Sequence, residues 1–343
     1  MFLRSIEWLD GKIRIIDQTK LPIKLEYKFL ETIDDVVEAI KSMRVRGAPL
    51  IGITGALGLA LVAYKLKDED RDYVIREIKT AYEKILNTRP TAVNLKWALD
   101  YVLSNSIDQA DVAESIIKNA LKLMERDIEI NRKIAEIGQI LISDGDVIMT
   151  HCNTGSLATV SVGTALGVII EAWKRGKRFL VYITETRPLL QGARLTAFEL
   201  KYANIPFTLI CDSAVGITIA KKKVNKIFVG ADRILLDGTT YNKVGTFQIA
   251  VIAKKFNVDF YVVAPTSTID IHSKRRDVII EERSKMEVLT IQDRLITSTD
   301  ITVYNPAFDE TPPEYVSAII TEKGIIYPPY EENLPKIMQH NTT

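Results

Sequence analysis

Two acidic side chains, each placed after an apolar segment, could do chemistry together. Cys152 comes directly after the apolar run at 146–151, and Asp232 follows the apolar run at 224–230. Each run is typical of a buried parallel strand, and the residues just past the carboxyl ends of such strands line the ligand crevice of an open α/β sheet. We therefore expect a thiol and a carboxyl group at one crevice, where they could serve as an acid–base pair.

Cys152 has a chemical and a structural interpretation. The sequence predicts a helix that begins near Gly155 or Ser156, and the backbone N–H groups at a helix start favour a thiolate. In that position Cys152 could act as a base or a nucleophile. The alternative is a small buried residue at a strand end, which is the usual fate of a free cysteine. We expect the other cysteine, Cys211, to lie in the core.

Asp232 likewise has two interpretations. A carboxyl group that donates a proton near neutral pH needs a raised pKa, and desolvation by the apolar segment 234–236 could raise it. Alternatively, the aspartate could cap a helix or pair with an arginine, and Arg233 is adjacent. His151, which precedes Cys152, is predicted to be a supporting residue or a hydrogen-bonded core histidine rather than a catalyst.

The segment Arg-Val-Arg-Gly-Ala-Pro at 44–49 is the best candidate for binding a phosphate. Gly47 admits a close approach of the backbone, and Pro49 is typical of the first turn of a helix, whose free N–H groups attract an anion. Arg46 adds a charged fork for phosphate oxygens. The segment therefore predicts an anion site at the start of a helix.

Two further segments could bind an anion. Asn242 and Lys243 follow the turn Asp-Gly at 237–238 and are predicted to open a helix, with Lys243 as a point charge. Arg89 is expected in a turn before Pro90. For each cation alone, a solvated surface position is the ordinary alternative. Their association with predicted helix starts and turns favours a role in binding.

The first part of the chain predicts a mostly helical domain with a small sheet, at residues 1–130. Short strands are expected at 12–16 and 27–30, and Thr32 is expected to cap a helix that runs to about Ser42. Further helices are predicted at 49–65, 70–86, 91–103 and 109–142, separated by turn and cap residues. The last of these helices is long enough to join two domains, with the boundary near residue 130.

Residues 131–343 predict a Rossmann-like domain with a doubly wound parallel sheet. Strands are expected at 146–151, 178–184, 206–211, 225–230 and 259–264, alternating with helices near 156–174, 190–203, 214–221 and 243–256. No G-x-G-x-x-G motif follows the first strand, so the fold alone implies no dinucleotide. A final helix is expected at 311–324, followed by an irregular segment after Tyr327.

Composition excludes several classes of partner. With 45 Lys and Arg against 44 Asp and Glu, the net charge is +1, and the basic footprint of a nucleic-acid-binding protein is missing. The cysteines and histidines form no metal-binding motif, so we expect no metal. The start of the chain has no apolar stretch typical of a signal peptide, which makes the cytoplasm the expected location. The charge-free stretch at 47–64 is interpreted as a buried core helix rather than a membrane span.

The chain resembles the methylthioribose-1-phosphate isomerases, within the larger superfamily that includes the regulatory subunits of initiation factor 2B. The likeness extends over nearly the whole chain. It rests on Arg-Val-Arg-Gly-Ala-Pro at 44–49, His-Cys-Asn-Thr-Gly at 151–155, Glu-Thr-Arg-Pro at 185–188, Gln-Gly-Ala-Arg at 191–194, Gly-Ala-Asp-Arg at 230–233, Asn-Lys at 242–243, Ala-Pro-Thr-Ser-Thr-Ile-Asp at 264–270 and Asn-Pro-Ala-Phe-Asp at 305–309.

The resemblance implies an aldose–ketose isomerase of methionine salvage, with Cys152 and Asp232 as the catalytic pair. It also implies a homodimer that needs no metal or cofactor. The residues implied to bind the sugar phosphate are Arg46, Gly47, Ala48, Arg89, Gln191, Asn242 and Lys243.

One segment departs from the isomerase pattern. Where the isomerases usually carry a methionine-containing stretch with a histidine, this chain has Asp-Ser-Ala-Val-Gly-Ile-Thr at 212–218, which resembles ribose-1,5-bisphosphate isomerases and the regulatory subunits. Both alternatives therefore stay open. Asp232 retained together with Cys152 favours catalysis over a regulatory role.

The expected reaction fits these two residues. A phosphate on the anomeric oxygen prevents spontaneous opening of the sugar ring, so an acid such as Asp232 is needed. Cys152 could then mediate the transfer of hydrogen from C2 to C1, either through an enediol or as hydride.

Overall fold

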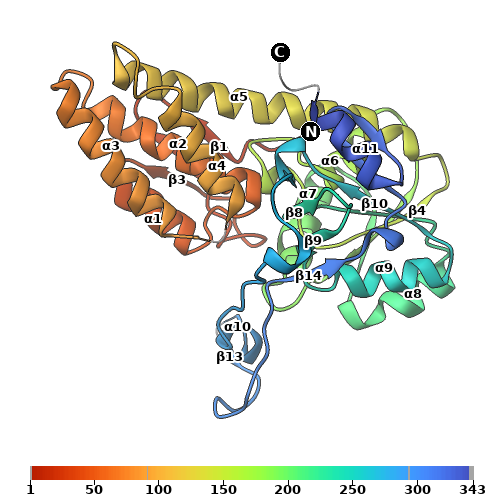
Figure 1. Cartoon of the computed structure of the whole chain (residues 1–343). Helices are drawn as coiled ribbons and strands as arrows, with labels where there is room; N and C mark the ends of the chain where they lie inside the picture. Colours follow the sequence, from red (N-terminus) through yellow and green to blue (C-terminus); the bar gives the residue numbers. More distant parts are fainter. Residues whose placement is uncertain (1, 91, 293, 340–343) are drawn as a thin grey trace. The chain divides into compact units, whose positions relative to one another are not determined.

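The computed structural model describes residues 2–90, 92–292 and 294–339, which form two compact units (Figure 1). The first unit comprises Met1–Arg132 together with Thr154–Gly163, and the second comprises Lys133–Asn153 with Thr164–Thr343. The division in the chain falls within helix α5 (Val112–Gly138). The segment that follows Cys152 and Asn153 therefore belongs to the N-terminal unit, although Cys152 itself belongs to the C-terminal one.

The N-terminal unit has a small antiparallel sheet and a set of helices. Its strands are β1 (Ile6–Trp8), β2 (Ile13–Ile16) and β3 (Tyr27–Leu30), in that order. The helices are α1 (Ile33–Lys41), α2 (Ala48–Lys65), α3 (Arg71–Leu86), α4 (Val93–Ser104) and the start of α5. The predicted strands and helices are confirmed, whereas β1 was not predicted. Thr32 caps α1 by accepting a hydrogen bond from the Asp35 N–H. Thr91, the expected start of α4, lies outside the described residues.

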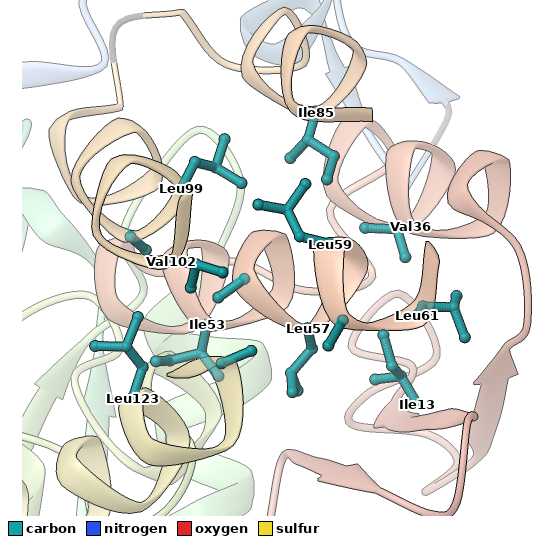
Figure 2. Packing of buried hydrophobic residues seen from close by; sticks show 14 of the residues in the cluster. Ile13, Val36, Ile53, Leu57, Leu59, Leu61, Ile85, Leu99, Val102 and Leu123 are labelled. Atoms are coloured by element: carbon teal, nitrogen blue, oxygen red, sulfur yellow. The ribbon is translucent and has the colours of Figure 1, made fainter. Parts of the chain in front are cut away.

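Helix α2 is the core of the N-terminal unit. Among the described residues, it is the one helix long and apolar enough to cross a membrane, and most of its length is buried inside the protein. Figure 2 shows Ile53, Leu57, Leu59 and Leu61 of this helix among apolar side chains of neighbouring elements. A Cβ at Gly52 would lie 2.8 Å from the Asn94 carbonyl oxygen, so α2 needs this glycine to pack against α4. The prediction of a buried core helix is confirmed.

The C-terminal unit is built on a sheet of seven strands in the order β16-β15-β10-β7-β4-β5-β6. All neighbouring pairs are parallel except β15 and β16, which are antiparallel. The strands are β4 (Val147–Thr150), β5 (Leu180–Thr184), β6 (Phe207–Ile210), β7 (Lys226–Val229), β10 (Asp259–Val263), β15 (Ala318–Thr321) and β16 (Gly324–Ile326). The mixed α/β fold with a parallel-rich sheet is confirmed, and the five strands predicted between 146 and 264 are all present.

The strand order reverses direction at β4. The chain passes from β4 outward to β5 and β6, and then returns to β7 on the other side of β4. The connecting helices are α6 (Ala165–Lys174), α7 (Ala197–Tyr202), α8 (Val215–Lys222) and α9 (Thr246–Lys255). A reversal of this kind leaves a crevice at the carboxyl ends of the two central strands, which is where open α/β sheets bind ligands.

A second, smaller sheet of the C-terminal unit was not predicted. Its strand order is β11-β8-β9-β14, from β11 (Ile269–Asp270), β8 (Arg233–Leu235), β9 (Thr240–Lys243) and β14 (Phe308–Thr311). Between β11 and β14 the chain forms a segment with α10 (Met286–Leu289) and the hairpin β12 (Thr290–Ile291) and β13 (Arg294–Leu295) (Figure 1). This sheet is important for the site because β8 and β9 directly follow Asp232.

Two helices begin later than predicted. The helix expected at 156–174 is α6, which begins at Ala165, and only a single 3-10 turn, η2 (Ser156–Ala158), follows Cys152. The helix expected at 243–256 is α9, which begins at Thr246 after Gly245. The first prediction placed the helix start at the end of β4, where the chain first makes a loop. The second placed it at Lys243 after a turn, but Lys243 is the last residue of strand β9. The helix expected at 109–142 ends at Gly138 and continues as a 3-10 turn, η1 (Gln139–Leu141).

The end of the chain differs most from the prediction. The segment 311–324 forms the end of β14, a 3-10 turn η7 (Pro313–Tyr315) and strand β15 instead of a helix. The Thr-Pro-Pro sequence resembles a helix start, but the fully buried β-branched run in β15 pairs with β10. The segment after Tyr327, predicted to be irregular, contains helix α11 (Tyr330–Gln339), which is anchored by the buried side chains of Tyr330 and Leu334.

Candidate active site

Cys152 and Asp232 follow two strands that are direct neighbours in the sheet. β4 and β7 pair in parallel, with Thr150 opposite Phe228. Cys152 comes directly after His151 at the end of β4, and Asp232 follows the loop at the end of β7. These are also the two strands at which the strand order reverses, so the backbone delivers both residues to the carboxyl edge where ligands bind in folds of this type.

Cys152 is buried and held in an unusual backbone conformation. Its side chain and backbone together are 9% exposed, and its φ is +60°, in the left-handed region. The Cys152 N–H donates to Thr186 Oγ1 at 2.9 Å, and the Cys152 carbonyl accepts from Thr196 Oγ1 at 2.5 Å. The α-helix predicted to begin beside Cys152 is absent there: a single 3-10 turn begins at Ser156, and α6 begins only at Ala165. A cation provides the positive charge near this thiol instead.

That cation is Lys243, the last residue of β9. Its half-buried ammonium group donates to the Ala307 carbonyl oxygen at 2.8 Å and lies 5.2 Å from the centre of the Phe308 ring. Desolvation lowers the pKa of Lys243, whereas the negative charges of Cys152 and Asp232 act in the opposite direction. Lys243 is therefore within electrostatic reach of both candidate catalytic groups. It ends a strand rather than opening a helix, so the predicted reason for its anion binding is corrected.

Asp232 lies at the start of the small sheet and is half-buried. Its backbone N–H donates to the Tyr241 carbonyl at 2.9 Å. The neighbouring Arg233 forms an ion pair with Asp270 at 3.4 Å, so the arginine next to Asp232 has a carboxylate partner of its own. Ile234 and Leu235 are buried, as expected for the apolar segment that follows Asp232.

Asn242 lies beside Lys243 on β9 and is buried. Its amide group donates to Thr246 Oγ1 at 3.0 Å, and that hydroxyl donates in turn to the Lys243 carbonyl at 2.6 Å. The opposite residue on β14 is Asp309, whose carboxylate accepts from the Gly245 and Phe247 N–H groups at the start of α9. Burial raises the pKa of Asp309 to about 6. A carboxylate thus already occupies the start of this helix, which therefore does not offer the predicted anion site.

Gln191 lies before the π-helical turn η3 (Gly192–Thr196) of the C-terminal unit. Its side chain is buried, with 7% exposed, and its Oε1 atom has no hydrogen-bond partner in the described part of the chain. A buried amide oxygen without a partner costs free energy, which a polar ligand can recover by donating to it. π-Helical turns are also frequent at functional sites. Both features fit the predicted role of Gln191 in binding.

The remaining predicted residues belong to the N-terminal unit. Gly47 has a φ of +94° and precedes helix α2, which begins at Ala48 with Pro49 in its first turn. A Cβ at Gly47 would lie 2.7 Å from the Ala158 backbone, so this position requires glycine. Arg46 is half-buried just before this helix start, and Arg89 is half-buried after the end of α3. The helix start predicted at 44–49 is confirmed.

Sequence reasoning missed several residues that surround the site. Arg283 and Glu287 form an ion pair at 2.7 Å. The charge of Arg283 lowers the pKa of Lys243, and the charge of Glu287 raises it. Thr184 and Thr186, at the end of β5, contact His151 and the backbone of Cys152. Thr186 lies within the quoted Glu-Thr-Arg-Pro motif, so its presence there was the available signal, but the spacing alone assigns it no role. His151 is a buried, hydrogen-bonded histidine, as predicted.

The remaining His, Cys, Asp and Glu side chains were also candidates for a metal centre. Within residues 2–90, 92–292 and 294–339, no group of three or more His, Cys, Asp or Glu side chains could hold a metal ion. Cys211 is exposed, so the prediction that it lies in the core is wrong. It follows the edge strand β6, which has a neighbour on one side only and leaves its end open to solvent.

Comparison with known proteins identifies the family. Residues 44–328 match the model of the initiation factor 2 subunit family. A relative from Methanocaldococcus jannaschii, called a putative methylthioribose-1-phosphate isomerase, is 51% identical over 97% of this chain and 98% of its own length. The solved 5-methylthioribose 1-phosphate isomerase of Pyrococcus horikoshii OT3 is 40% identical, with a TM-score of 0.92 over 98% of this chain and 96% of that one.

A second solved structure carries a different title. It is described as the translation initiation factor eIF-2B, subunit delta, from A. fulgidus, and it is 47% identical with a TM-score of 0.89, covering 98% of this chain and 99% of that chain. The resemblance that the sequence motifs predicted is confirmed by these matches. The chain belongs to the initiation factor 2 subunit family.

Proposed function

We propose that this chain is an aldose–ketose isomerase that converts 5-methylthioribose 1-phosphate to 5-methylthioribulose 1-phosphate in methionine salvage. The relatives that carry this name match it over nearly their whole length. The observation that carries the proposal is the placement of Cys152 and Asp232 after adjacent strands, with Lys243 within electrostatic reach of both. A regulatory subunit without activity has no use for this arrangement of a thiol, a carboxyl group and a half-buried lysine.

Asp232 is assigned the role of general acid. The phosphate on the anomeric oxygen blocks spontaneous opening of the sugar ring, so a proton must be delivered to the ring oxygen. Asp232 suits this step because it is a half-buried carboxyl group that follows the end of β7, the strand next to the one that precedes Cys152. The opened sugar then carries its reactive centre at C1 and C2.

Cys152 is assigned the transfer of hydrogen from C2 to C1. As a thiolate it can remove the C2 proton to give an enediol-type intermediate and return the proton to C1. The alternative is a direct hydride shift from C2 to C1 in a pocket from which water is excluded, with Cys152 as a neighbour of the reacting carbons. The burial of Cys152 and the nearby charge of Lys243 are compatible with both routes.

The remaining predicted residues are assigned to substrate binding. In the C-terminal unit these are Gln191, Asn242 and Lys243, of which Lys243 supplies charge and Gln191 an amide oxygen without a partner among the described residues. In the N-terminal unit the resemblance assigns the same role to Arg46, Gly47, Ala48 and Arg89, and the start of α2 at Ala48 supports it, since free N–H groups at a helix start attract phosphate. No metal or cofactor enters the proposed reaction.

We further propose that the chain works as a homodimer in the cytoplasm. The homodimer rests on the family resemblance. The free thiols of Cys152 and Cys211 are in keeping with a reducing compartment. The division into an N-terminal domain at 1–130 and a catalytic domain at 131–343 is likewise proposed as the functional division.

A sister activity has one observation in its favour. The segment 212–218 resembles ribose-1,5-bisphosphate isomerases, and Asp212 within it accepts hydrogen bonds from the Thr186 and Arg187 N–H groups beside the site. The two substrates differ at the 5-position, where a phosphate needs a second anion site and a methylthio group needs an apolar pocket. The third reading, a noncatalytic regulatory subunit, predicts stable association with initiation factor 2 and no turnover.

One experiment separates these three functions. The purified protein is incubated without added metal with 5-methylthioribose 1-phosphate and, separately, with ribose 1,5-bisphosphate, and ketose formation is followed by NMR. The proposal predicts turnover of the methylthio sugar, with much slower turnover of the bisphosphate. Turnover of the bisphosphate alone would show that the chain is a ribose-1,5-bisphosphate isomerase. Turnover of neither sugar would favour the regulatory role.

A further inference from the structure

An unbroken run of hydrogen bonds extends from Cys152 to the loop that follows Lys243. The Cys152 N–H donates to Thr186 Oγ1 at 2.9 Å, and Thr186 Oγ1 lies 3.1 Å from Thr184 Oγ1. Thr184 Oγ1 lies 2.7 Å from His151 Nδ1, and His151 Nε2 lies 2.9 Å from the Val244 carbonyl oxygen. The side chains of Thr184, Thr186 and His151 are all buried.

The two ends of this run fix the direction of every hydrogen bond in it. The Val244 carbonyl can only accept, so His151 Nε2 carries a hydrogen, and in the neutral ring Nδ1 must then accept. Thr184 therefore donates to His151. Its single hydrogen is thereby used, so Thr186 donates toward Thr184, either to the hydroxyl at 3.1 Å or to the more distant carbonyl at 3.4 Å. The neutral ring is consistent with burial, which lowers the pKa of His151.

Two residues of this run, Cys152 and Thr186, have a left-handed backbone conformation. Cys152 has a φ of +60° and Thr186 a φ of +64°, and the left-handed region is a clear outlier for a β-branched residue such as threonine. Asp212 accepts from the Thr186 N–H at 2.8 Å and from the Arg187 N–H at 2.7 Å, which holds this backbone in place. Strain of this kind persists only where the surroundings determine the conformation, and it is concentrated at functional sites.

The other end of the run, at Val244 and Gly245, packs against the ring of His151. A Cβ at Gly245 would lie 3.1 Å from His151 Cε1, so the loop after Lys243 lies directly against the imidazole ring. Val244 is the residue that follows Lys243, and its carbonyl is the group that His151 binds. The backbone positions of Cys152 and Lys243 are thus joined through side chains that carry no part of the proposed chemistry themselves.

We infer that Thr186, Thr184 and His151 are positioning residues, which hold the backbone of Cys152 and the loop beside Lys243 in a fixed relative position for the reaction. The inference rests on the proposed function, because it matters only if Cys152 acts on the substrate. Loss of the Thr186 hydroxyl removes the acceptor of the Cys152 N–H, and loss of Thr184 or His151 removes the support of that hydroxyl, so Cys152 is held less firmly in the left-handed conformation. The thiol then spends less time in line with C1 and C2 of the substrate.

The test compares Thr186→Val, which removes the hydroxyl at nearly constant volume, with Thr186→Ser, which keeps it. A matched control is Thr150→Val on β4, because Thr150 is buried and its hydroxyl has no hydrogen-bond partner among the described residues. Turnover of 5-methylthioribose 1-phosphate is measured for each, together with the melting temperature. If Thr186→Val does not fold, Thr184→Val breaks the same run one link further along.

For Thr186→Val we expect a fall in kcat of about 10-fold or more with little change in KM, since the substrate-binding groups are untouched. Thr186→Ser should restore most of the kcat, and Thr150→Val should resemble the wild type. A merely structural role would lower the melting temperature without separating kcat from KM. The inference is overturned if Thr186→Val keeps the wild-type kcat, or if Thr186→Ser and Thr150→Val lose as much as Thr186→Val.

A second readout separates this inference from the proposed function. In a Cys211→Ser background, where the exposed thiol is absent, the rate of alkylation by iodoacetamide reports on Cys152 alone. We expect Thr186→Val to change this rate several-fold and Thr150→Val to leave it unchanged. If the wild-type protein turns over no sugar, the proposed function fails. If the wild-type protein does turn over sugar, and Thr186→Val has the same kcat and the same alkylation rate as the wild type, only the positioning role is refuted.

Discussion

The two strand ends that deliver the catalytic candidates differ in the elements that hold their backbones. After β4, Cys152 is buried in a left-handed conformation. Its backbone N–H donates to Thr186, and its carbonyl accepts from Thr196. After β7, Asp232 is half-buried, and its N–H donates to Tyr241 of the small sheet. The sheet thus places one group by a dense polar network and the other by the start of a hairpin.

The difference matches two different chemical tasks. A group that transfers hydrogen between adjacent carbons must be aligned closely with both, which requires an immobile backbone. A carboxyl group that protonates a ring oxygen needs reach and a suitable pKa more than a rigid backbone. The comparison therefore predicts that activity is lost when the carboxyl group of Asp232 is replaced. At Cys152, activity should be lost both when the thiol is replaced and when the residues that hold its backbone are changed.

The largest expected effect follows Asp232→Asn, which keeps the shape of the side chain but removes its proton. We expect a folded protein that binds the sugar phosphate and loses about 10²- to 10⁴-fold in kcat, the usual contribution of a general acid. The measurement is steady-state turnover with a melting curve for each protein. Turnover like that of the wild type in this variant would remove Asp232 from the mechanism.

Cys152→Ser should cause a loss of similar size, slightly smaller if the hydrogen moves as hydride. The hydroxyl of serine is far less acidic than a thiol, so the variant lacks a base while the backbone contacts persist. Cys211→Ser makes the same chemical change at an exposed position and serves as the control. Equal turnover in the two variants would show that the buried thiol has no special role.

Lys243→Met should act mainly on substrate affinity. Loss of a charged contact to phosphate typically costs about 1.5–3 kcal/mol, which corresponds to a rise in KM of about 10- to 100-fold. Lys254→Met, on the exposed face of α9, removes the same charge away from the site and should leave KM unchanged. A KM unaffected by Lys243→Met would exclude this lysine from phosphate binding.

His151 gives the smallest and most specific effect, on the pH dependence of stability. Burial lowers its pKa in the folded state below the unfolded value, so the unfolded chain binds more protons in mild acid. Stability contributed by the neutral ring is therefore present above about pH 6.5 and declines as the pH falls, by at most about 1.4 kcal/mol per pH unit.

The variant His151→Gln tests this directly, because its amide group can donate to Val244 and accept from Thr184 without titrating. Urea unfolding at pH 7.5 and pH 5.5 should show a smaller difference for the variant than for the wild type. An identical difference for both proteins would mean that His151 does not titrate with unfolding.

The sequence was sufficient to predict the central part of the fold because local patterns determine it. Apolar runs form the parallel strands β4, β5, β6, β7 and β10, and such strands can be read from composition alone, even though the edge strand β6 is partly exposed. The same pattern placed Cys152 and Asp232 after strand ends. That β4 and β7 are neighbours could not be read, since strand order is a property of the whole sheet.

The errors lie where pairing between distant segments decides the structure. Asn242 and Lys243 looked like a helix start after a turn, but they pair with Asp309 and Phe308 of β14. Pro312 and Pro313 looked like the first turn of a helix, although β15 lies between β10 and β16 in the large sheet. Thr184 and Thr186 were missed for the same reason, because their hydrogen bonds with His151 and Cys152 exist only once β4 and β5 are paired.

The most direct test of a shared site is a double-mutant cycle on turnover of 5-methylthioribose 1-phosphate, with Cys152→Ser, Asp232→Asn and the double variant. If both groups act on one substrate in one site, ring opening and hydrogen transfer depend on each other, and the double variant should be about as slow as the slower single variant. A double variant whose loss equals the product of the two single losses would show two independent contributions and contradict the account.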